Sequence, residues 1–202
     1  VLLVIDTNAA GVSKTAVFNS IDGSNHAAYA FDQVQVPASH MIGQPGEGMP
    51  RALGQIGDTR LAIASTCVGH MRWVYAYVSD YLAAPDRSGK PRGNAPIARL
   101  RLGEMFSAAY AARSMLYRTA RLVDSGTNAV NEAMATKVHA TNALTMIVDE
   151  AIQIVGGSAV VDSHPLAQLY KSTRSLRLTE GATDVLLQNV ARGTLDLGKG
   201  SI

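Results

Sequence analysis

One carboxylate in the sequence stands where general-base chemistry could take place. Glu180 follows the largely apolar segment 176–179 and is followed at once by Gly181, at the predicted start of a helix. A carboxylate that is held in such a position and shielded from water is basic enough to accept a proton from carbon. The residues alone favour a simpler role, in which Glu180 stabilises the positive end of the following helix.

Other common active-site patterns are missing from the sequence. It contains no Gly-x-Ser-x-Gly elbow, no Gly-x-Gly-x-x-Gly after a strand and no phosphate-binding loop that ends in Gly-Lys-Ser/Thr. The five histidines are dispersed, and no two of them lie one helical turn apart: His26, His40, His70, His139 and His164. We therefore predict neither a nucleophilic triad nor a metal site.

The composition bounds the class of protein. A chain of 202 residues with 47% hydrophobic content can bury a substantial core. Its net charge of +2 gives no reason to expect nucleic acid as a partner. No apolar run approaches the roughly 20 residues that a membrane helix needs. The single cysteine, Cys67, allows neither an internal disulfide framework nor a cysteine-based zinc site, so we expect a cytoplasmic protein.

The hydrophobic pattern divides the chain into a short β part and a long helical part. Turn signals and the alternation at residues 30–36 indicate strands as far as about residue 42, and the Gly- and Pro-rich segment 43–48 ends this part. Helical periodicity then predicts five helices, at about residues 49–82, 96–125, 129–155, 165–173 and 181–196. Long helices joined by short loops predict a mainly α fold, an antiparallel four-helix-type bundle preceded by a partial β-domain. We place the division between residues 1–45 and 46–202.

The first residues suggest a chain that starts inside a domain. Residues 1–5 form a β-branched apolar run, which is typical of a strand that is covered on both faces and paired with neighbours. We therefore expect a fragment of a larger protein. The helices are rich in alanine and aromatic residues make up only 5% of the chain, so we also expect association with other subunits.

Several segments, taken in order, resemble the C-terminal half of the acyl-CoA dehydrogenase family. The resemblance covers essentially the whole chain. It rests on Phe31–Pro37, Gly43, Gly46–Gly48, Thr59-Arg60, Arg87, Gly89–Pro91, Leu102–Met105, Ala151–Gly157, Pro165, Tyr170, Arg174 and Glu180-Gly181. It implies the second half of a middle β-domain followed by a C-terminal helical domain.

The resemblance implies an FAD-dependent oxidation of an acyl-CoA thioester to the trans-2-enoyl product. Glu180 falls on the catalytic base, which removes the α-proton while the β-hydrogen leaves as hydride to the flavin. Gly181 falls where the backbone approaches the substrate carbonyl, and a residue without a side chain permits that approach. Thr59 and Arg60 fall on a pair at the substrate side of the base.

The resemblance also implies a flavin site that is shared between subunits. Arg87 falls on an arginine that reaches the FAD diphosphate of a neighbouring subunit, a task suited to a bidentate cation. Gln153, Gly156 and Gly157 fall on a motif that lines the adenosine end of the same flavin. Thr183, after the Glu-Gly turn, is the remaining cofactor-side residue.

The implied partners are an acyl-CoA substrate, an electron-acceptor flavoprotein and further copies of the chain, in the family's usual homotetramer. Some positions depart from the family pattern: Ser88 replaces an aromatic residue, Pro96 a common Gln, and Ala182 a common Thr. Two alternatives stay open. One is a flavin monooxygenase or oxidase relative on the same fold, and the other is a non-catalytic subunit of a hetero-oligomeric acyl-CoA dehydrogenase.

Overall fold

The computed structural model describes residues 1–200, and the chain divides into two compact units. The first unit is Val1–Asp58, and the second begins at Thr59, within helix α1 (Gly48–Ala83). The described residues contain five α-helices and one two-stranded sheet, which confirms the predicted mainly α fold with a small β part. No helix among residues 1–200 is long and apolar enough to cross a membrane.

An antiparallel hairpin is the main feature of the first unit. Strands β1 (Val12–Asn19) and β2 (Asn25–Phe31) pair from Val12 opposite Phe31 to Asn19 opposite Asn25. The connecting loop is closed by the Ser20 N–H, which donates to the Ser24 carbonyl at 2.8 Å, and Gly23 supplies a backbone φ of +82°. Glycine adopts this left-handed conformation without the steric cost that a Cβ would add.

One segment of strand-like composition does not form a strand here, and one β prediction for this unit was wrong. Residues 1–5 do not form a buried strand: only Leu3 pairs, in a single bridge with Met41, and Val1 and Val4 are exposed. The alternating segment 30–36 contributes only its first two residues to β2, because Gln33 takes a φ of +47° and breaks the extended backbone. The described part of the chain offers these residues neither a full partner strand nor a covering layer, and burial on both faces requires both.

The second unit is a helical bundle whose helix ends follow the local sequence. Besides α1 it contains α2 (Pro96–Asp124), α3 (Val130–Val155), α4 (Pro165–Leu176) and α5 (Thr183–Leu197). Proline opens α2 and α4, where its missing N–H costs no helical hydrogen bond. The ring of His164 accepts from the Leu166 N–H at 3.2 Å and caps α4, and Gly156, at a φ of +85°, ends α3.

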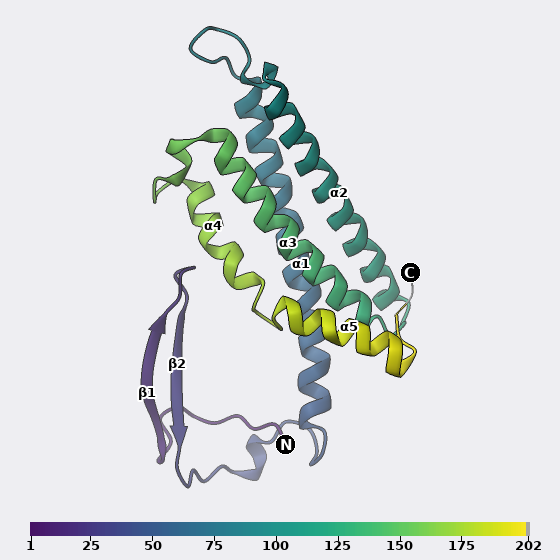
Figure 1. Ribbon diagram of the computed structural model, residues 1–202. Helices are drawn as coiled ribbons and strands as arrows, with labels where there is room; N and C mark the ends of the chain where they lie inside the picture. Colours follow the sequence, from purple (N-terminus) through teal and green to yellow (C-terminus); the bar gives the residue numbers. More distant parts are fainter. Residues whose placement is uncertain (201–202) are drawn as a thin grey trace. The chain divides into compact units, whose positions relative to one another are not determined.

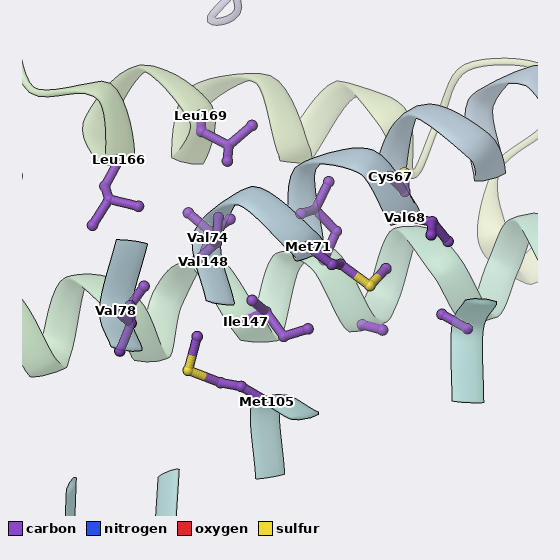
Figure 2. Close-up of a cluster of buried hydrophobic side chains, with 14 of the residues drawn as sticks. Cys67, Val68, Met71, Val74, Val78, Met105, Ile147, Val148, Leu166 and Leu169 are labelled. Atoms are coloured by element: carbon purple, nitrogen blue, oxygen red, sulfur yellow. The ribbon is translucent and has the colours of Figure 1, made fainter. Parts of the chain in front are cut away.

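Helix α3 lies at the centre of this bundle. It contacts α2, α4 and α5, and in Figure 1 α2 and α4 run beside it while α5 crosses its first turns. Buried side chains from α1, α2, α3 and α4 form the main core, part of which is drawn in Figure 2. A second cluster, made by Met134 and Val138 of α3 with Leu186 of α5, attaches the last helix. Alanines from α1, α2 and α3 contribute to the main core beside larger Val, Leu, Ile and Met side chains.

Candidate active site

The Glu180-Gly181 turn joins α4 to α5. After α4 ends, the Thr179 N–H and hydroxyl donate to the Ser175 carbonyl at 2.9 and 3.0 Å. Beyond the turn, the Thr183 N–H and hydroxyl both donate to the Arg177 carbonyl, at 3.1 and 3.3 Å. These bonds close the loop on both sides within the α4–α5 segment itself.

The backbone of this turn is strained. Glu180 has a φ of +55°, a left-handed conformation that residues with a Cβ adopt at a cost. Gly181 follows at a φ of +114°, and a Cβ at that position would lie 2.7 Å from Cδ2 of the buried Leu186. Strain of this kind persists where the surrounding structure enforces it, and it is common at functional sites.

Two cations from other helices hold the strained backbone of this turn in place. The Arg60 Nε of α1 donates to the Glu180 carbonyl at 3.0 Å, and the Lys137 Nζ of α3 donates to the Gly181 carbonyl at 2.9 Å. Burial lowers the pKa of the Arg60 guanidinium, and the negative charge of Glu180 acts in the opposite direction. Arg60 lies one helical turn before Ala64 on the buried stripe of α1, so the helix itself directs it inward.

The residues predicted at the substrate side therefore come together in part. Glu180, Gly181 and Arg60 meet at one turn, Thr183 closes that turn, and Glu180 is half-buried. Thr59 is half-buried and directly precedes Arg60 on α1. Chemically, the arrangement presents one carboxylate on a fixed backbone, flanked by two cations that hold the carbonyls rather than the side chain.

The residues predicted for the cofactor, apart from Thr183 at the turn, lie in a separate part of the bundle. Gln153 lies sixteen positions beyond Lys137 on α3, which corresponds to about 24 Å along a helix. It lines a surface pocket of about 460 Å³ together with side chains from α1, from the loop before α2 and from α2 itself. Gly156 and Gly157 follow at the end of α3, and a Cβ built on either would meet no protein atom within 4 Å. The backbone at these glycines is therefore open to a ligand.

Arg87 lies in an exposed turn beside this pocket and is not one of its lining residues. The turn is organised by Asp86, whose carboxylate accepts from the Ser88 N–H and hydroxyl and from the Lys90 N–H. The hydrogen bond from the Ser88 hydroxyl is the largest cause of the lowered pKa of Asp86. Asp86 itself lines the pocket.

Sequence reasoning missed three cations near the two groups. Arg92 lines the pocket and lies over the Tyr81 ring, with 4.6 Å from its Cζ to the ring centroid. Arg101 lines it as well and pairs with Glu150 of α3. Lys137 was missed although the sequence carried a signal: it is the one charged residue on the buried face of the predicted helix 129–155. Among residues 1–200 no three potential metal-binding side chains gather.

Comparison with known proteins decides the family. The model of the acyl-CoA dehydrogenase C-terminal domain matches residues 46–195. The chain belongs to the acyl-CoA dehydrogenase family. It is 30% identical over 181 residues to the very long-chain specific acyl-CoA dehydrogenase of Bos taurus mitochondria, which covers 89% of this chain and 28% of that protein.

Several solved structures share the fold. Butyryl-CoA dehydrogenase from Megasphaera elsdenii superposes with a TM-score of 0.87 at 22% identity, over 96% of this chain and 51% of the other. A structure described as PigA with FAD and proline superposes with a TM-score of 0.89 at 21% identity, over 95% and 51%. The chain thus spans about half of these structures and less than a third of the bovine relative.

Proposed function

We propose that this chain is the C-terminal part of an FAD-dependent acyl-CoA dehydrogenase in which Glu180 removes the α-proton of the thioester. The observation that carries the proposal is the Glu180-Gly181 turn. The backbone of Glu180 is held in a strained conformation by Arg60 and Lys137. The chain also belongs to the acyl-CoA dehydrogenase family. Strain that is enforced from two other helices is better explained by a functional carboxylate than by a helix-capping one.

In this proposal each residue at the turn has a separate task. Glu180 accepts the proton, and the fixed backbone keeps its carboxylate within reach of the substrate α-carbon. Gly181 lets the backbone approach the thioester carbonyl, where a hydrogen-bond donor stabilises developing enolate charge. Arg60 holds the Glu180 carbonyl, and Thr59 lies beside it on the substrate side. Because Glu180 is half-buried in this chain, substrate and the rest of the enzyme supply the remaining exclusion of water.

The group around Gln153 suits the adenosine and diphosphate end of FAD. Bound flavin supplies the acceptor for the β-hydride. Gln153 offers an amide, Gly156 and Gly157 offer open backbone, and Arg87 together with Arg92 offers positive charge for phosphate oxygens. A flavin monooxygenase on the same fold would need this group as well but not an α-proton base at Glu180, whereas the oxidase alternative is left open by this residue.

The remaining assignments extend this proposal to the whole protein. We place the domain division at residues 45 and 46, with the helical domain in 46–202. The electrons pass to a separate acceptor flavoprotein, and copies of the chain share flavin sites in a homotetramer. The cytoplasmic location stays a prediction from cysteine content.

The test is Glu180→Gln in the full-length enzyme with FAD bound. We expect anaerobic bleaching of the flavin by acyl-CoA to slow by about 10²–10⁴-fold, the usual contribution of a general base, while the yellow cofactor is retained. Glu104→Gln, which changes an exposed carboxylate on α2, is the matched control and should bleach at the wild-type rate. Bleaching of the Glu180→Gln enzyme at the wild-type rate would refute the assignment. A colourless full-length protein that binds flavin only with a partner would instead favour the non-catalytic subunit.

A further inference from the structure

Lys137 is the most unusual residue in the helical core. Its side chain has no exposed surface, and it is the only Lys or Arg among the buried residues of the described chain. It lies on α3 one helical turn before Thr141 and is surrounded by core residues of the bundle, so burial lowers the pKa of its ammonium group. A buried ammonium is costly unless a specific partner compensates it, and this makes its partner informative.

That partner is the turn that carries Glu180. The Lys137 Nζ donates to the Gly181 carbonyl at 2.9 Å, next to the carbonyl that Arg60 holds at 3.0 Å. Two successive peptide groups are thus held from two different helices. The Gly181 carbonyl belongs to the peptide between Gly181 and Ala182, and Gly181 has the wide rotational freedom of a residue without Cβ. The Lys137 bond therefore restrains, on the α5 side of Glu180, the angle between the two peptides that flank Gly181.

We propose that Lys137 is a positioning residue, which holds the Gly181 peptide and thereby the direction of the Glu180 carboxylate. This inference rests on the proposed function, since it needs Glu180 to be the base. Lys137 acts through the backbone and touches neither substrate nor flavin in this account. A small misplacement of a reacting group costs rate far more than it costs binding. Loss of the bond should therefore affect turnover and leave affinity intact.

The experiment uses Lys137→Met in the full-length FAD enzyme. Methionine fills a similar volume but cannot donate to the Gly181 carbonyl. We expect kcat and the rate of anaerobic flavin bleaching to fall about tenfold to a hundredfold, with KM for acyl-CoA and the flavin content unchanged. The unfolding midpoint should stay the same or rise, because an apolar isostere of a buried ion is often neutral or stabilising. A purely structural lysine would give the reverse pattern, a lower midpoint with normal kcat.

Thr141→Val is the matched control. Thr141 is equally buried on the same stripe of α3, but its hydroxyl donates only within the helix, to the Val138 carbonyl at 3.2 Å. This variant should keep the wild-type kcat. If Lys137→Met does not fold, Lys137→Gln replaces it, because its side chain retains polarity but is one bond shorter, which lengthens the hydrogen bond to the Gly181 carbonyl. The same loss of kcat is expected.

Each outcome separates the two proposals. Normal bleaching by a folded Lys137→Met or Lys137→Gln enzyme overturns the positioning role, while a slow Glu180→Gln enzyme leaves the proposed function standing. Normal bleaching by Glu180→Gln removes the base and the positioning role together. Failure of both Lys137 variants to fold shows a structural residue and also overturns the proposal.

Discussion

Replacement of Glu180 by glycine should give a protein that is more stable than the one with alanine at this position, and both replacements should remove the activity. Glu180 and Gln33 are the only non-glycine residues of the described chain with a positive φ. The left-handed conformation costs a residue with a Cβ about 1–2 kcal/mol, and the extra freedom of glycine in the unfolded chain costs about 0.5–1 kcal/mol. The difference leaves the glycine variant more stable by between roughly 0 and 1.5 kcal/mol.

The reference for this comparison is Glu180→Ala. Alanine removes the same carboxylate, and with it the same charge beside Arg60 and Lys137, but it keeps the Cβ and hence the strain. Both variants should fail to bleach the flavin with acyl-CoA, and urea unfolding of the full-length FAD enzyme should give the free-energy difference between them. A glycine variant that is less stable than the alanine variant would refute the strain argument.

Three further perturbations test other parts of the structure. Gly181→Ala should lower the free energy of unfolding by roughly 1–3 kcal/mol, because a φ of +114° disfavours a residue with a Cβ and the added Cβ would lie 2.7 Å from Cδ2 of Leu186. An unchanged urea midpoint would contradict this. Ile147→Ala should cost about 2–5 kcal/mol of unfolding free energy, since Ile147 is completely buried on α3, and a loss below 1 kcal/mol in urea would argue against this core. Burial raises the pKa of the Cys67 thiol from 9.0 to about 12. The unfolded chain therefore loses this proton first, and the free energy of unfolding should fall as the pH rises from 9 towards 12. Because the thiolate is the reactive form, alkylation of Cys67 at pH 8 should be about a thousandfold slower in the folded than in the urea-unfolded protein. Equal alkylation rates in the two states would show an accessible thiol.

The sequence was sufficient for the helices and for the family. The predicted ends of the three long helices agree with the structure to within one residue, at Gly48–Ala83, Pro96–Asp124 and Val130–Val155. Periodicity of 3.6 residues, with proline at the starts and glycine at the ends, is local information that the sequence displays directly. The Glu180-Gly181 pair was likewise visible, although its catalytic role stays a prediction.

The β part was less predictable. Residues 1–5 have the composition of a buried strand, but composition does not provide a partner or a covering layer, and the described chain gives Leu3 one bridge. Strand formation depends on residues that are distant in the sequence, and a pattern within one segment cannot indicate whether they are present.

Only the tertiary structure showed what holds the candidate base. The bonds from Arg60 and Lys137 to the turn span 120 and 44 residues of sequence. Helical periodicity indicates that a residue faces the core, but it does not identify the group that the residue will meet there. The sequence by itself therefore determined which helices form and which carboxylate to consider. Packing of α1 and α3 against the α4–α5 turn decided its conformation, because strain at Glu180 persists only where several distant groups enforce it.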